Sequence, residues 1–160
     1  MLDAPLENVT VKVRGRDVIL DPNNMKFNEA TLSEYMDREY GWIDYFGKQL
    51  EFAHKEMLDA EVDYDALYAK KYVSAKDLGG TENYAKCVAA SDDDVVKARK
   101  KVTECKETVG LLKAHLKAWD KNHDNAQNRG HTLRKERDKL NNNVIYQQEE
   151  STCSAEDFLK

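Results

Sequence analysis

Basic side chains gather in the last third of the chain, and their types and spacing suit contact with phosphate groups. Five Arg or Lys residues lie within the eleven positions from Arg129 to Lys139. A guanidinium group can donate two hydrogen bonds to one phosphate and can also stack on a base. Lys113, Lys117 and Lys121 precede this segment at a spacing of four, which on a helix places them on one side. The pattern predicts a cationic stripe that follows a sugar-phosphate chain without reading its sequence.

The residues that we assign to phosphate contact on this basis are Lys113, Lys117, Lys121, Arg129, Arg134, Lys135 and Arg137. The alternative interpretation is a solvated helix face, since Lys and Arg cover the outside of most coiled coils. Earlier in the chain, Tyr64, Tyr68 and Tyr72 repeat every four residues around Lys70 and Lys71. Aromatic rings beside lysines can stack the bases of a single strand, although four-residue aromatic spacing also indicates helix packing.

Residue patterns of the common enzyme classes are missing from the sequence. There is no GxGxxG, phosphate-binding loop, HExxH or nucleophile elbow. His115, His123 and His131 recur every eight residues, a spacing that drifts around a helix and builds no metal-binding face. The acidic run at 92–94 fits the first turn of a helix, with Ser91 as its capping hydroxyl. We therefore predict a protein without catalytic activity, metal or cofactor.

Two long segments carry the apolar spacing of coiled-coil helices, with rows of residues seven apart. In the later segment the rows are Val95, Val102, Val109 and Leu116, interleaved with Ala98, Cys105, Leu112 and Trp119. In the earlier segment they are Met36, Ile43, Leu50, Met57 and Tyr64, interleaved with Phe46, Ala53, Ala60 and Leu67. Such helices pack against each other or against copies of themselves, so these rows predict the core and the oligomer contacts.

The 160-residue chain is 34% charged, and its charge is unevenly divided. Residues 28–66 hold eleven acidic and three basic side chains, and residues 97–139 hold thirteen basic and six acidic ones. The two segments therefore carry net charges of −8 and +7. Local charge, more than the total of −5, decides which surface meets an anionic partner.

These patterns predict a mainly α fold, a long antiparallel helical hairpin or coiled coil that assembles into a homo-oligomer. Residues 1–24 form an N-terminal arm with a β-hairpin, since alternating valines precede a turn at Arg14–Arg16. Residues 25–140 form the helical domain, with long helices at about 28–72 and 91–140 and a short one at about 82–90. Asn and Gly between 122 and 130 predict a joint in the second long helix, or a frayed region that becomes ordered on assembly. Residues 141–160 are expected to form a flexible acidic tail.

Membrane and secretory signals are absent from the sequence. No apolar run approaches the about 18 residues of a membrane span, and residues 1–8 contain Asp3 and Glu7 and no apolar block. Cys87, Cys105 and Cys153 are widely spaced and form no CxxC motif. We expect an intracellular protein that does not bind membranes.

Several short segments together form a familiar layout, and they are Leu20–Pro22, Glu56–Leu58, Tyr72–Ser74, Ser91–Lys97, Trp119 and Asn128–His131. This layout resembles the UvsY-type recombination mediators of tailed phages. The similarity covers roughly residues 20–138. The family's basic pair late in the first helix has its nearest counterpart in Lys70 and Lys71, which differ in spacing, and the N-terminal hairpin and acidic tail are additions.

The resemblance implies a ring-like homo-oligomer that binds single-stranded DNA and has no catalytic activity. It would help a RecA-like recombinase replace single-strand-binding protein on DNA, in the cytoplasm of a phage-infected cell. It also adds Lys70 and Lys71 to the expected DNA contacts. The alternative is a structural or adaptor coiled coil whose basic late helix pairs with the acidic early helix of a neighbouring subunit.

Overall fold

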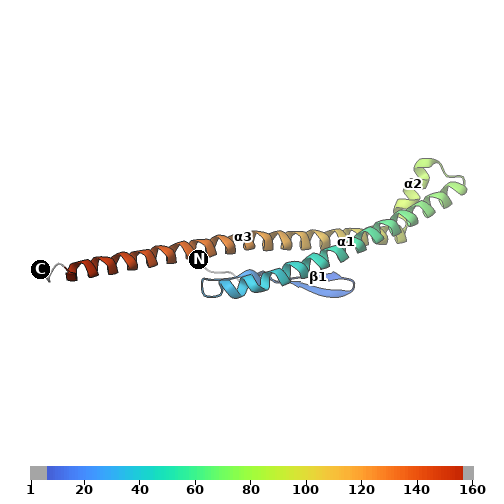
Figure 1. The fold of residues 1–160 in the computed structure, drawn as a ribbon. Helices are drawn as coiled ribbons and strands as arrows, with labels where there is room; N and C mark the ends of the chain where they lie inside the picture. The colour runs from blue at the N-terminus through green and yellow to red at the C-terminus, as the bar shows by residue number, and fades with distance from the viewer. Residues whose placement is uncertain (1–6, 157–160) are drawn as a thin grey trace.

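The computed structural model describes the backbone of residues 7–156 and the side chains of residues 7–141. The fold is mainly helical, with a two-stranded antiparallel sheet near the N-terminus (Figure 1). The elements in order are β1 (Val9–Val13), β2 (Arg16–Leu20), the 3-10 helix η1 (Pro22–Met25), α1 (Leu32–Asp77), α2 (Glu82–Ser91) and α3 (Asp93–Glu156). The prediction of a helical hairpin with a small N-terminal β-hairpin is confirmed.

The helices α1 and α3 lie side by side and antiparallel over most of the length of α1 (Figure 1). Their apolar rows face each other within one chain, and the aromatic rings of Trp42, Phe46 and Trp119 stack in the centre. The buried members of the rows are Phe46, Ala53, Ala60, Val95, Val102, Val109, Leu112 and Trp119. The half-buried members include Ile43, Leu50, Met57 and Leu116. These rows form the contact between α1 and α3, which we call the seam. Burial of their apolar side chains is the main source of the stability of this elongated fold.

The β-hairpin lies against both long helices (Figure 1). Its alternating side chains place Val11, Val13, Val18 and Leu20 in the core and leave the intervening residues exposed. The two-residue turn needs left-handed backbone, which Arg14 and Gly15 adopt with φ of 51° and 71°. The backbone N–H of Arg14 donates to both carboxylate oxygens of Glu56 on α1, each at 3.0 Å. This contact fixes the turn to the helix.

The connection from α1 to α3 passes through α2, which folds back onto α1 through buried Ala75, Ala85 and Ala89. Glycine is required at Gly80, because a Cβ there would lie 2.8 Å from the carbonyl oxygen of Ala75. The cap of α3 differs from the prediction, since Ser91 is the last residue of α2.

Asp92 caps α3 in place of Ser91. Its Oδ1 accepts hydrogen bonds from the backbone N–H groups of Asp94 at 3.0 Å and Val95 at 3.4 Å. The acidic run at the start of α3 is therefore a helix cap, as its composition indicated, with the capping role moved by one residue.

α3 runs without interruption from Asp93 to Glu156. The predicted joint at 122–130 is wrong, because Asn122 and His123 bond to groups of the preceding elements and Ala126 is fully buried. The predicted mobile tail is helical from 141 to 156, and the sequence after Gly130 holds no glycine or proline to stop the helix. Residues 157–160 of that tail lie outside the described residues.

Candidate nucleic-acid interface

Six of the predicted phosphate contacts form one exposed set on α3, which we call the basic face. Its members are Lys113, Lys117, Lys121, Arg134, Lys135 and Arg137. None of the six forms an ion pair with another side chain among residues 7–141, and Arg134 donates from Nε to its own helix at the carbonyl of Gly130, at 3.2 Å. The charged groups of the basic face are thus exposed to solvent and available to a binding partner.

The spacing of the seam explains the direction of the basic face. Lys117 follows the half-buried Leu116 by one residue, and Lys121 follows the buried Trp119 by two, so both lie on the side of α3 away from α1. Lys135 follows Lys121 by fourteen residues, which is two heptads, and therefore repeats its direction.

Arg134 and Arg137 lie where α3 has passed the beginning of α1. At Gly130 a Cβ would meet Leu32, the first residue of α1, at 3.8 Å, and Leu133 still packs against the core. α3 then runs on past the beginning of α1 (Figure 1). Arg137 stands seven residues after Gly130 and three heptads after Leu116, in a seam row. It is exposed because α1 does not reach it. The basic face therefore spans the paired and the unpaired parts of α3, over about 36 Å from Lys113 to Arg137.

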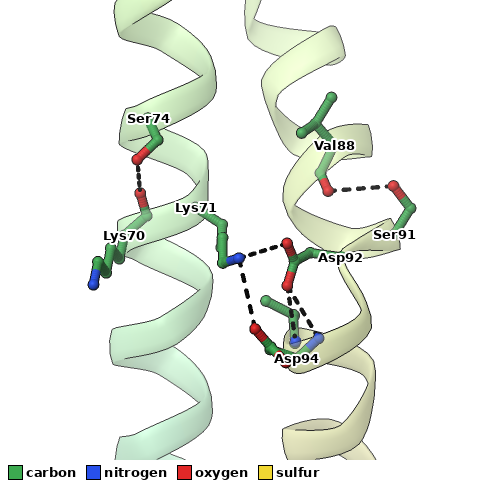
Figure 2. Close-up of polar contacts among 8 residues, drawn as sticks. Lys70, Lys71, Ser74, Val88, Ser91, Asp92 and Asp94 are labelled. Atoms are coloured by element: carbon green, nitrogen blue, oxygen red, sulfur yellow. Dashed lines mark hydrogen bonds and ion pairs between the residues drawn. The ribbon is translucent and has the colours of Figure 1, made fainter.

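Lys71 has a different role from the basic face, although sequence reasoning grouped them. Figure 2 shows its ammonium group turned toward the start of α3, where Nζ donates to Asp92 Oδ2 at 2.7 Å and lies 3.8 Å from Asp94 Oδ2. The hydrogen bond that Lys71 donates to Asp92 raises the pKa of Lys71, and the same bond lowers the pKa of Asp92. Lys71 thus ties α1 to the cap of α3.

Lys70, its neighbour, points away from this contact in Figure 2, and its backbone carbonyl accepts from Ser74 Oγ at 3.0 Å. It is exposed, but it belongs to α1 and lies far from Lys113 along the hairpin. The structure therefore does not bring Lys70 and Lys71 together with the basic face.

Arg129 is also engaged within the chain. Its guanidinium contacts the carboxylate of Glu29, in the segment before α1. Lys106, nearer the start of α3, pairs in the same manner with Glu61, with 2.8 Å between its Nζ and Glu61 Oε1. The acidic first half of the chain thus neutralises Lys106 and Arg129 of α3, and it forms no ion pair with the six members of the basic face.

A buried polar layer crosses the seam at the point where the sequence predicted a joint. Glu39 occupies the seam row seven residues before Phe46 and is 0% exposed, and its carboxylate contacts Nδ1 of His123. Gln127 lies against the other ring nitrogen of His123 at 2.7 Å. Polar residues inside a coiled-coil seam fix the register of the helices at a cost in stability. Sequence reasoning missed this layer, although the heptad position of Glu39 signals it.

Asn122 extends the layer. Its amide donates to Tyr35 Oη at 2.9 Å and to the backbone carbonyl of Met25. Burial raises the pKa of the Tyr35 hydroxyl, and the charge of Glu39 adds to the effect. Asn is a poor helix former, but these hydrogen bonds satisfy the side-chain amide of Asn122 within α3.

Several aromatic side chains serve packing, whereas Tyr40 and Tyr84 are 64% and 59% exposed. Tyr64 and Tyr68 are half-buried, with ring centroids 6.2 Å apart. His115 accepts at Nε2 from the indole N–H of Trp119 at 3.0 Å and packs edge-on against Phe46. Burial lowers the pKa of His115, which favours the neutral ring that this hydrogen bond needs.

Metal and membrane sites receive no support from the described residues. Among them, no three His, Cys, Asp or Glu side chains are grouped so that they could hold a metal ion. Within the same range, no helix has a segment apolar enough to cross a membrane.

The geometry thus offers one extended surface with unpaired cations on a helical scaffold. Comparison of the chain with protein-family models, curated proteins and solved structures finds no match.

Proposed function

We propose that the protein binds single-stranded DNA along the basic face of α3, without reading its sequence and without catalysing a reaction. The observation that carries the proposal is the set of six exposed cations, none of which forms an ion pair with another described side chain. Flexible lysines and arginines exposed along one helix suit contact with successive phosphates. The rings of Trp42 and Trp119 pack in the core and are not available to stack on bases, so the proposal rests on phosphate contacts.

The choice of a single strand and of a recombination role rests on the resemblance to recombination mediators. In that role the protein would load a RecA-like recombinase onto DNA covered by single-strand-binding protein. A mediator has to hold the strand and then release it. Individually weak, salt-sensitive contacts allow this, and a ring-like homo-oligomer would multiply them.

The proposal is tested by titrating a fluorescently labelled oligo-dT with the full chain at several salt concentrations. Six phosphate contacts predict a slope of about −4 for the logarithm of the binding constant against that of the salt concentration. Replacing Lys113, Lys117 and Lys121 by Glu removes half of these contacts, and the slope should fall to about −2.

The matched control changes the charge equally at exposed lysines outside α3, through Lys26→Glu, Lys48→Glu and Lys76→Glu. It should keep the steep slope if the basic face binds the strand. Equal weakening by both triple variants would show that total charge matters and the face does not. A wild-type chain that ignores oligo-dT at low salt would rule the proposal out and favour the adaptor alternative.

A further inference from the structure

An open hollow lies between η1 and the middle of α3, next to the basic face. Its volume is about 550 Å³, and its lining consists of Pro22, Met25, Lys26, Phe27, Asn122 and Asn125. The lining contains one cation and no carboxylate, so it does not repel a polyanion. We call this feature the η1 hollow.

The η1 hollow lies at the end of the lysine row of the basic face. Lys113, Lys117 and Lys121 follow one another at a spacing of four, and the next step of this row is Asn125. Residues four apart are neighbours on a helix surface, about 6 Å apart along the helix axis. A strand whose phosphates follow the three lysines therefore reaches the hollow at the next step.

The wall of the hollow on the η1 side is apolar. Pro22, Met25 and Phe27 are half-buried, and each lines the hollow. The Phe27 ring packs against Tyr35, with ring centroids 4.8 Å apart, and Asn122 holds Met25 by donating to its backbone carbonyl. The wall is thus fixed in place before a ligand arrives, which lowers the entropy that binding has to lose.

Two amide side chains form the polar edge of the hollow on α3. The side-chain nitrogen of Asn122 donates to Tyr35 and Met25, and its Oδ1 forms no hydrogen bond with another described residue. Asn125 is exposed, and its amide has no hydrogen-bond partner within residues 7–141. The edge therefore offers hydrogen-bond donors and acceptors. A nucleobase has a flat apolar face for the wall and matching donors and acceptors for this edge.

We propose that the η1 hollow binds one unpaired base of the strand whose phosphates lie on the basic face. The base stacks on the apolar wall, and its edge meets the amides of Asn122 and Asn125. Stacking tolerates every base because each has a π face, so the contact agrees with binding that does not read the sequence. This proposal rests on the proposed function, since the phosphate contacts bring the strand to the hollow.

The hollow gives a structural reason for preferring a single strand to a duplex. Contacts with phosphates alone are open to both, because both carry the same backbone charge groups. A base inside a duplex is already paired and stacked, and it has to be extruded at a cost before it can enter a pocket. The base of a single strand enters at a much lower cost.

The first test compares two labelled strands of equal length, oligo-dT and a strand with the same phosphates but abasic sites in place of the bases. The wild-type chain should bind oligo-dT about fivefold or more tightly, because stacking of a base is lost in the abasic strand. The two salt slopes should be equal, since the phosphate contacts are the same. Equal affinities would overturn the hollow and leave phosphate binding intact, whereas a chain that binds neither strand would overturn both.

Variants test where the base binds. Phe27→Ala should remove most of the preference for oligo-dT and leave the affinity for the abasic strand unchanged, which also shows that the variant is folded. Tyr84→Ala is the matched control, because it removes an exposed ring on α2, at the other end of the hairpin (Figure 1). Asn125→Ala changes an exposed residue and should reduce the preference about threefold. The proposal is overturned if Phe27→Ala and Asn125→Ala both keep the preference, or if Tyr84→Ala loses it equally.

Photo-cross-linking locates the base without any substitution. An oligo-dT with 5-iodouracil at single positions cross-links, on irradiation, to aromatic and sulfur side chains that touch the base. Mass spectrometry of the full chain should find the cross-link at Met25 or Phe27. Cross-links at the exposed rings of Tyr40 or Tyr84 with none at the hollow would overturn the proposal.

Discussion

On the seam side of α3, Leu112 and Trp119 are buried against α1, whereas Lys117 and Lys121 on the opposite side are exposed without an acidic partner in the described chain. Both sets of residues follow the same helical repeat. The first set packs against α1 of the same chain, whereas the second set is exposed and available to bind another molecule. The difference separates residues that stabilise the hairpin from residues available for binding, and substitutions on the two sides should differ accordingly.

The largest effect is expected from shortening a seam residue beside an outward one. Leu112 is 0% exposed and Leu111 is 42% exposed. Leu112→Ala should lower the free energy of unfolding by about 3 kcal/mol, because it leaves a cavity in the core. Leu111→Ala should change it by less than about 0.5 kcal/mol. Urea denaturation followed by circular dichroism measures both, and similar losses would contradict the assignment of the two sides.

The polar layer in the seam should give the next largest effect. His123→Ala leaves the buried carboxylate of Glu39 without its partner, which should cost about 2 kcal/mol in the free energy of unfolding. His131→Ala is the control, because His131 is an exposed histidine on the same helix. Chemical denaturation of the two variants distinguishes them. A stable His123→Ala protein would mean that Glu39 gains nothing from the histidine.

The cap of α3 provides a smaller test on neighbouring residues. Asp92→Ala removes both the cap hydrogen bonds and the contact with Lys71, and it should lower the melting temperature. Ser91→Ala should lower it much less, since Ser91 Oγ only donates to the carbonyl of Val88, within α2. Thermal unfolding can rank the two. If Ser91→Ala were the more destabilising variant, Ser91 would be the cap of α3, as the sequence suggested.

The smallest expected effect depends on pH. Burial lowers the pKa of His115 below its unfolded value, so the folded chain binds fewer protons at this ring. The resulting stability is complete above the unfolded pKa of about 6.5 and is lost as the pH falls below it. His115→Gln, which can still accept from the Trp119 indole, should make the fall from pH 7 to 5 shallower. We expect less than about 1 kcal/mol, since the ring is partly solvated. Denaturation followed by tryptophan fluorescence measures the free energy of unfolding at each pH. The same dependence on pH in His115→Gln and the wild type would refute the prediction.

The sequence predicted the helical hairpin well because seven-residue rows such as Val95, Val102 and Val109 have one stable arrangement, burial along a helix seam. The alternating valines of the β-hairpin were equally informative. Helix propensity wrongly predicted a break at 122–130, because the tertiary hydrogen bonds of Asn122 and His123 outweigh the low helix propensity of these residues. The end of the helix was also predicted wrongly, since α3 continues past residue 140, where no glycine or proline stops it.

The candidate site was predictable in part. Exposure of Lys117 and Lys121 follows from their spacing relative to Leu116 and Trp119. The engagement of Lys71 with Asp92 and of Arg129 with Glu29 joins residues far apart in sequence, and no local pattern reveals it. Long-range pairing therefore decided which predicted cations remain available.

The most direct test of the central claim is lysine footprinting by acetylation and mass spectrometry, with and without oligo-dT. The basic face predicts that DNA protects Lys113, Lys117, Lys121 and Lys135, and leaves Lys48, Lys70 and Lys76 on α1 as reactive as before. Protection of the α1 lysines with none on α3, or no protection at saturating DNA, would contradict the account.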